Sequence, residues 1–233
     1  LPKNQSKAFF YYQKASELGN LLAISNLGVC YENGIGVEKN LTKAIELYKK
    51  ATQLNSAHGA KCLGFCYMQG IGVNQNDIKA IKYLKEAVHL GYNEAYFLLG
   101  SIYERGNDVK QNLTKATKYF KKSLENGDNR ALTKLASIYV QNDLKTAFQY
   151  YEKAAEILND TDTMVKIGEF YQNGSVVNRN HVKAFNYYKK AADLGSSIAM
   201  YKLGEYYYSD LFGNDYKTAV EYYGITLTIV QNY

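Results

Sequence analysis

The chain has 233 residues, with 28 basic and 22 acidic side chains and a formal net charge of +6. This small excess of positive charge, without any run of Lys or Arg longer than a pair, argues against nucleic-acid binding, which usually gathers basic residues on one patch. No stretch approaches the ~20 consecutive apolar residues of a membrane-spanning helix, so we expect no direct membrane insertion.

The first 20 residues carry the second helix of a two-helix unit. Ala8, Tyr12 and Ala15 are spaced by four and three residues, which places them on one face of an α-helix. Gly19 follows, and Gly readily takes the left-handed conformation that ends a helix. Because this pattern begins at once and residues 1–4 show no apolar signal core, we expect the chain to be a fragment of a longer protein.

From residue 21 the two-helix unit recurs, and a Leu-Gly pair or a close variant marks its first helix. Successive pairs lie 36 residues apart, except for one interval of 32. A Tyr follows three residues after each pair, which continues one helix face. In chain order the pairs and their Tyr residues are Leu27-Gly28 with Tyr31, Leu63-Gly64 with Tyr67, Leu99-Gly100 with Tyr103, Leu135-Ala136 with Tyr139, Ile167-Gly168 with Tyr171, and Leu203-Gly204 with Tyr207.

The second helix of each unit carries an Ala, a large residue four positions later and a small residue or Thr three beyond that. A Gly-rich turn such as Gly34-Ile35-Gly36 joins the two helices, and the fourth unit has lost about five residues of it, so we expect a tighter turn there. The helix markers are Ala44, Tyr48 and Ala51; Ala80, Leu84 and Ala87; Ala116, Phe120 and Ser123; Ala147, Tyr151 and Ala154; Ala184, Tyr188 and Ala191; and Ala219, Tyr223 and Thr226.

The period divides the chain into a preceding half-unit and six full units. No stretch rich in Pro or Ser interrupts it, so we expect one continuous solenoid domain, with a hinge near residues 141–143 as the alternative. The expected boundaries are 1–20 for the half-unit, then 21–56, 57–92, 93–128, 129–160 with the short turn, 161–196 and 197–233.

The pattern Ala-x3-Leu-Gly-x2-Tyr-x2-Gly-x-Gly-Val, followed by Lys-Ala-x3-Tyr-x2-Ala-x3-Gly, resembles the Sel1-like repeat, a relative of the tetratricopeptide repeat. The resemblance covers essentially the whole chain and implies an all-α, right-handed α-α superhelix of about six and a half repeats. Departures are the short fourth unit, Asp108 where a second turn Gly is usual, and Thr226 in the last unit.

Proteins with this repeat are similar to one another in acting as adaptors. The resemblance therefore implies a non-catalytic scaffold that binds a protein or peptide along a concave face lined by the first helix of each unit. It also leaves open a regulatory or targeting region of a larger enzyme, or of a ubiquitin-ligase or ER-degradation complex. A secreted bacterial effector that binds a host protein is a further alternative.

Motifs of catalysis and of cofactor binding are missing from the sequence. The turn at Gly34 lacks the preceding strand and the third Gly of a dinucleotide fingerprint, and no nucleophile elbow, His-Glu-x-x-His or phosphate loop occurs. The odd count of Cys30, Cys62 and Cys66 argues against a complete disulfide framework, so we expect reduced structural thiols. We therefore expect no enzyme, no cofactor and no metal site.

Five glycosylation sequons bear on the location of the protein. They fit a secretory-pathway lumen, but an Asn-rich composition explains them as well. We favour a cytoplasmic location and leave secretion and the ER lumen open. The sequons begin at Asn4, Asn40, Asn112, Asn159 and Asn173.

A first candidate binding site is apolar and lies in the N-terminal half. In the related tetratricopeptide family, groove residues lie three before, one after and four after the Gly of the Leu-Gly pair. On this chain, these positions include Val29, Phe65, Met68 and Phe97. Large apolar side chains at exposed positions favour an interaction site. The alternative is that these four residues belong to the ordinary core.

A second candidate site is basic and lies in the C-terminal half. Lys134, Lys166 and Lys202 share the column two residues before the Gly, and Arg130 lies one helical turn before Lys134. We expect these residues to receive an acidic segment of a partner. The alternative is a solvated stripe, in which Glu residues three positions after Lys166 and Lys202 neutralise them.

A more specific interpretation of the basic site is a clamp for the terminal carboxylate of a chaperone. Similar basic positions play this part in some tetratricopeptide proteins. In this chain Leu98 and Ser101 stand where that clamp has Asn, which counts against the interpretation.

Overall fold

The computed structural model describes residues 3–210 and 213–231, and these residues form α-helices joined by turns, without a β-strand. None of the described helices is both long enough and apolar enough to cross a membrane. The predicted all-α repeat fold is confirmed. The helices are α1 (Lys3–Glu17), α2 (Leu21–Asn33), α3 (Leu41–Gln53), α4 (Ala57–Gln69), α5 (Asp77–His89), α6 (Ala95–Arg105), α7 (Leu113–Glu125), α8 (Ala131–Tyr139), α9 (Leu144–Leu158), α10 (Thr161–Asn173), α11 (His181–Asp193), α12 (Ser197–Tyr208) and α13 (Tyr216–Gln231).

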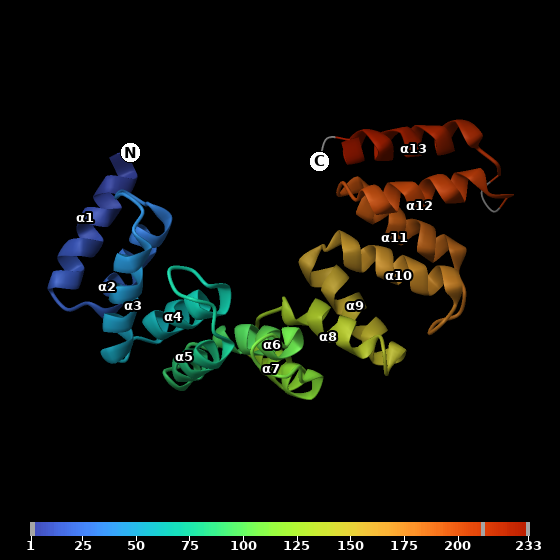
Figure 1. Cartoon of the computed structure of the whole chain (residues 1–233). Coiled ribbons are helices and arrows are strands. Elements are labelled where there is room, and N and C mark those ends of the chain that lie inside the picture. The colour runs from blue at the N-terminus through green and yellow to red at the C-terminus, as the bar shows by residue number, and fades with distance from the viewer. Residues whose placement is uncertain (1–2, 211–212, 232–233) are drawn as a thin grey trace. The chain divides into compact units, whose positions relative to one another are not determined.

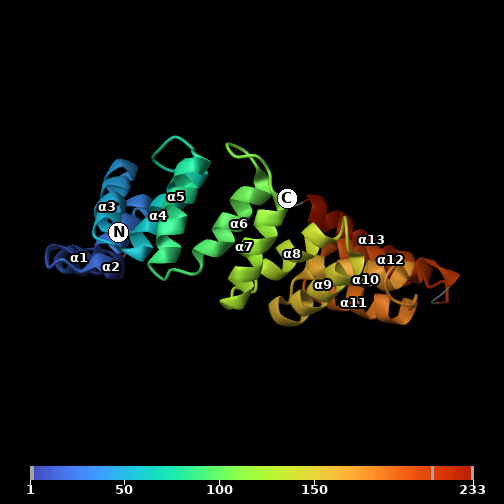
Figure 2. The same cartoon turned by 90° about the horizontal axis from the view of Figure 1, so that it is seen from below.

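Each repeat is a pair of helices, which we call A and B in chain order. Every A helix packs most extensively against the B helix that follows it, and each B helix also packs on the next A helix within its unit. Figure 1 shows this stacking in α10 to α13, and Figure 2 shows α4 beside α5 and α6 beside α7. The A–B pairs are α2 with α3, α4 with α5, α6 with α7, α8 with α9, α10 with α11, and α12 with α13.

The chain forms two compact units, residues 1–128 with α1 to α7 and residues 129–233 with α8 to α13. Each unit has its own cluster of buried apolar side chains. The boundary between the units precedes the short turn of the fourth repeat. One continuous solenoid, and the alternative of a hinge at residues 141–143, therefore stay predictions.

The Leu-Gly pair requires Gly because the large residue of helix B packs directly on the backbone of helix A at this position. A Cβ added at Gly28 would lie 2.5 Å from the Tyr48 ring, and one added at Gly100 would lie 2.7 Å from the Phe120 ring. Both rings are fully buried. Small residues thus allow the close approach of the helices, and large ones fill the space between them.

The Tyr three residues after the pair closes the turn between helices A and B. In the second repeat the Tyr67 carbonyl accepts a hydrogen bond from Asn76 N at 2.8 Å. The Tyr67 ring stacks on Tyr83 with 5.7 Å between centroids, and Lys79 Nζ lies 5.3 Å from the Tyr67 ring. The same ring stack recurs in Tyr103 with Tyr119, Tyr139 with Tyr150, Tyr171 with Tyr187, and Tyr207 with Tyr222.

An Asn begins most B helices as an N-cap. Asn40 Oδ1 accepts a hydrogen bond from Lys43 N at 3.0 Å, and Asn112 Oδ1 accepts one from Lys115 N at 2.8 Å. Asn is among the best N-cap residues, so helix capping accounts for Asn at this column. Two of the five sequons therefore begin at positions where the fold itself favours Asn.

The short fourth turn preserves the same junction with fewer residues. The interval from the Tyr to the cap falls from nine residues, Tyr31 to Asn40, to four, Tyr139 to Asp143. Asp143 N still donates to the Tyr139 carbonyl at 2.8 Å, and Asp143 Oδ1 caps Thr146 N at 3.0 Å. The deletion removes the Gly-rich loop and leaves the contact between the helices in place.

Candidate functional site

Two cavities of the second unit form the candidate site, and each lies between consecutive repeats. We call the first the polar pocket and the second the apolar pocket. The polar pocket has a volume of about 270 Å³ and is lined by Gln172, His181, Lys202, Glu205, Tyr206 and Ser209. The apolar pocket has a volume of about 250 Å³ and is lined by Val140, Leu144, Tyr151, Lys166, Glu169, Phe170, Asn173 and Ser175.

The two pockets occupy the same place in the repeat. The A helix of the later repeat supplies one wall of each pocket, and equivalent residues on α10 and α12 are 36 positions apart. The end of the preceding A helix and the first residue of the preceding B helix supply the other wall. The equivalent residues are Lys166 and Lys202, Glu169 and Glu205, Phe170 and Tyr206, Asn173 and Ser209, Val140 and Gln172, and Leu144 and His181.

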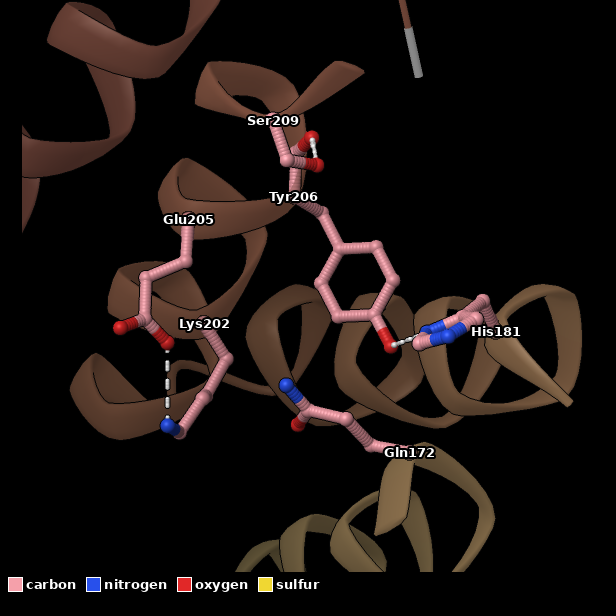
Figure 3. A pocket seen from close by; sticks show the side chains of 6 residues that line it. All are labelled: Gln172, His181, Lys202, Glu205, Tyr206 and Ser209. Carbon is pink, nitrogen blue, oxygen red and sulfur yellow. Dashed lines mark hydrogen bonds and ion pairs between the residues drawn. The ribbon is translucent and has the colours of Figure 1, made fainter. Parts of the chain in front are cut away.

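Hydrogen bonds hold the side chains of the polar pocket in place (Figure 3). Lys202 Nζ lies 3.0 Å from Glu205 Oε2, and the Tyr206 hydroxyl lies 3.1 Å from His181 Nδ1. Burial, with Glu205 nearby, raises the pKa of Tyr206 to about 12, so its hydroxyl keeps its proton at neutral pH. Positive and negative charge are balanced inside the pocket.

Gln172 presents a hydrogen-bond donor to the polar pocket. The buried Tyr188 hydroxyl donates to Gln172 Oε1 at 2.7 Å, which fixes the orientation of the amide. In the part of the chain that the structure describes, Gln172 Nε2 has no hydrogen-bond partner. Figure 3 shows this nitrogen on the side of the amide that faces Lys202 and Tyr206.

The apolar pocket has a hydrophobic floor and a charged rim. Tyr151 and Phe170 are buried, with their rings 6.2 Å apart, while Val140 and Leu144 are 38% and 41% exposed. Lys166 Nζ lies 2.9 Å from Glu169 Oε2, and this hydrogen bond is the main reason that the pKa of Lys166 is raised. The pocket can receive an apolar side chain without burying a charge.

The four basic residues predicted from the sequence lie on or next to the A helices of the second unit. Lys166 and Lys202 line the two pockets, and each is paired with the Glu three residues later. Arg130, which is exposed, precedes α8, and Lys134 lies within that helix, where the residue three positions later is Ser137. Binding of an acidic partner by these basic residues stays a prediction. The two ion pairs are the ones expected if Lys166 and Lys202 are instead solvated and neutralised by Glu three residues later.

The four apolar candidates of the first unit pack against its interior. Met68 is buried, and Val29 and Phe65 are half-buried against the core cluster. The Phe97 ring lies 5.5 Å from the ring of Phe120. These contacts are the ones expected if the four residues belong to the ordinary core. Partner binding through them stays a prediction.

Side chains occupy the equivalent place in the first unit. Between the second and third repeats Asp77 is fully buried, and its Oδ1 lies 2.6 Å from Arg105 Nη2. Asp108 Oδ2 accepts a hydrogen bond from Asp77 N at 2.8 Å, and Met68 is buried alongside Arg105, whose Nη2 is 3.5 Å from the Met68 carbonyl. The inter-repeat place is therefore open in the second unit and bridged by an ion pair here.

The cysteines lie apart from the pockets. All three are buried free thiols. Burial raises the pKa of Cys62 to about 11 and that of Cys66 to about 12, so both stay protonated at neutral pH. Among the described residues no group of three His, Cys, Asp or Glu side chains is arranged to hold a metal ion.

Most pocket residues, including Gln172, His181 and Leu144, belong to no motif in the sequence and were not predicted. The only signal is a column comparison. The first residue of the B helix is Leu41, Asp77, Leu113, Leu144, His181 or Tyr216, so this position changes character from repeat to repeat. Because this residue lines the space between two repeats, its variation makes that space chemically different from one pair of repeats to the next.

Comparison with known proteins follows the repeat structure closely. The Sel1 repeat family model matches residues 1–20, 21–56, 63–92, 93–128, 131–156, 161–196 and 197–225. Among solved structures, a Sel1 repeat protein from Oxalobacter formigenes has 26% sequence identity and a TM-score of 0.78 over 97% of this chain and 96% of that one. No curated protein matches the chain in sequence.

A second solved structure is c5321, a protective antigen present in uropathogenic Escherichia coli strains and displaying an SLR fold. It has 24% identity and a TM-score of 0.82, and the match covers 96% of this chain and 49% of that one. The chain thus spans about half the length of the E. coli protein, and the likeness concerns the fold alone.

Proposed function

Because the chain belongs to the Sel1 repeat family, whose fold is typical of protein–protein interaction scaffolds, we propose that it is a non-catalytic adaptor that binds a protein through the A helices of its second unit. The observation that carries this proposal is the pair of equivalent pockets between consecutive repeats. Half-buried side chains surround the polar pocket, exposed ones surround the apolar pocket, and both pockets contain groups able to contact a peptide.

The chemistry of the pockets supports binding rather than turnover. The polar pocket holds an imidazole, a phenol, an ammonium and a carboxylate, but the ammonium is paired with the carboxylate and the imidazole with the phenol. The apolar pocket offers a ring-lined floor and no nucleophile paired with a base. Such partly polar, partly apolar surfaces are typical of interfaces that recognise a peptide segment.

Site-specific photocrosslinking in the native source tests the proposal. A photoreactive phenylalanine analogue at Leu144, on the rim of the apolar pocket, is expected to crosslink a protein partner. The matched control is the same analogue at Ile157, which is exposed on α9 outside both pockets. A partner captured from Leu144 and absent from Ile157 supports binding at the pockets. Equal capture from both positions contradicts it.

A further inference from the structure

Resting on the proposed function, we propose that the polar and apolar pockets together form a two-point site for one extended peptide. This peptide carries an apolar side chain and an uncharged carboxamide side chain three residues apart. The apolar side chain enters the apolar pocket, and the Gln or Asn carboxamide enters the polar pocket.

The charge balance of the polar pocket selects an uncharged polar group. Lys202 and Glu205 already neutralise each other at 3.0 Å. A carboxylate ligand would compete with Glu205 for the ammonium and meet a like charge, and an ammonium ligand would do the same on Lys202. Desolvating a charge that has no free counter-charge costs more than the contact returns.

A carboxamide satisfies both kinds of group that the polar pocket presents. Its carbonyl oxygen can accept from Gln172 Nε2, the donor that has no partner in the described part of the chain. Its NH2 group can donate to Glu205, whose carboxylate has acceptor capacity beyond the bond to Lys202. Tyr188 holds the Gln172 amide in the orientation that this pairing needs.

The apolar pocket selects the other anchor. Tyr151 and Phe170 form a buried floor, and Val140 and Leu144 leave part of their surface in water. A Leu, Met or Phe side chain seated there removes this apolar surface from water, which is favourable because of the hydrophobic effect. Both side chains of the rim ion pair are partly exposed, so their charges need not be desolvated.

The spacing of the pockets sets the spacing of the anchors. Their A-helix walls are on α10 and α12, which belong to consecutive repeats and touch each other at a few positions. Packed helices lie ~8–10 Å apart. A polyproline II segment advances about 9.3 Å in one turn of three residues and so presents positions i and i+3 on one face at this separation.

Fluorescence anisotropy with labelled octapeptides and the full chain tests the inference. The probe is Ser-Ser-Leu-Ser-Ser-Gln-Ser-Ser, and a second probe carries Gln before Leu, because either chain direction fits the pockets. We expect one of the two to bind. Changing its Gln to Glu or Lys, changing its Leu to Ser, or moving the anchors one residue closer should each weaken binding by about tenfold or more.

Variants of the polar pocket give a matched reversal of specificity. Glu205→Gln removes the negative charge, and the preferred peptide should change from Gln to Glu. Lys202→Gln removes the positive charge, and the preference should change from Gln to Lys. The double change Lys202→Glu with Glu205→Lys restores the balance and should restore the preference for Gln. These side chains are 26% and 39% exposed, so we expect the variants to fold, which circular dichroism checks.

The outcomes separate this inference from the proposed function. Specific crosslinking at Leu144 combined with no preference for Gln over Glu and Lys leaves the adaptor function standing and overturns the carboxamide site. Tighter binding of the Glu peptide by the unchanged protein overturns it too, in favour of an acidic partner. Failure of both probes to bind at millimolar concentration also overturns it.

Discussion

At the scale of single residues, the close contact that recurs in most repeats is between a Gly on helix A and a large side chain on helix B. Gly100 and Phe120 show it plainly, because a Cβ on Gly100 would lie 2.7 Å from the ring. The fourth repeat carries Ala136 at the same column, opposite Tyr151, so one repeat tolerates the extra methyl group. The cost of a Cβ thus depends on how firmly the opposing ring is held.

Gly100→Ala is expected to lower the free energy of unfolding by about 1–3 kcal/mol, because the added methyl group overpacks a buried ring. Urea denaturation followed by circular dichroism measures the change. The matched control is Ala136→Gly in the same column, which loses about 1 kcal/mol of helix propensity and about 0.8 kcal/mol from one buried methyl group, but creates no overpacking. If Gly100→Ala is as stable as the wild type, the Phe120 ring can move aside and the close contact does not require Gly at this position.

His58 should make stability depend on pH. Burial, and then the charge of Lys61, lowers its pKa below the ordinary value of 6.5, while Glu94 acts in the opposite direction. The imidazole also packs near Cys62 and Tyr92, and its Nδ1 is buried without a partner in the described structure. The folded protein therefore favours neutral His58.

Because the unfolded chain binds the proton of His58 more readily, stability from this residue is present above about pH 6.5 and is lost as the pH falls. His58→Asn should flatten the fall of the melting temperature between about pH 7 and pH 5. His89→Asn, the same substitution at an exposed histidine, is the matched control for the chemical change itself. A profile that is identical for wild type and His58→Asn would contradict the argument.

At the scale of helices, the place between two repeats is defined by the end of one A helix, the start of its B helix and the face of the next A helix. In the first unit Asp77, Arg105 and Asp108 meet there between the second and third repeats. Between the first and second repeats the corresponding columns carry Leu41, Gln69 and Gly72, and Gly72 packs on Leu41. A buried ion pair offsets its own desolvation cost only when both partners are present.

Asp77→Ala should destabilise the protein by roughly 2–3 kcal/mol, because it leaves Arg105 without its counter-charge; the cost is moderated because the Arg105 side chain is 34% exposed. The triple change Asp77→Leu, Arg105→Gln and Asp108→Gly supplies the residues that lie between the first and second repeats. It should lie within about 1 kcal/mol of the wild type. Thermal unfolding measures both, and a triple variant as unstable as Asp77→Ala would show that the ion pair is indispensable.

At the scale of the whole molecule, stability is distributed between two units. In a solenoid each repeat interacts mainly with its neighbours, so a set of stacked repeats with its own core can fold without distant ones. The first unit contains a buried cluster that runs from Ala44 to Ile102, and the second contains one from Ala136 to Tyr206.

Residues 1–128 expressed alone are therefore expected to give a helical circular dichroism spectrum and a cooperative thermal transition. A spectrum of an unfolded chain would contradict this and would show that the first unit needs the second. Limited proteolysis of the full chain shows which connection between helices is cut first. It distinguishes a cut near residue 128 from one at the exposed residues 141–143.

The sequence by itself determined the repeat and most of its internal contacts. The Leu-Gly pair, the Tyr three residues later and the Ala of helix B recur at a fixed spacing, because each repeat must bury the same face against the same neighbours. The family and the all-α fold followed from these columns. The pairing of Lys166 and Lys202 with Glu three residues later also followed, since that spacing is one turn of a helix.

Only the tertiary structure decided where the repeats leave space. The walls of each pocket come from three helices or their ends, and Val140 and Phe170 line the same pocket although they are far apart in sequence. Whether the space between two repeats is open depends on the size and pairing of its side chains, and these side chains vary between repeats. In the first unit Asp77 and Arg105 bridge this space as an ion pair. Periodicity reports the contacts that every repeat shares, whereas a binding site is made of the positions at which the repeats differ.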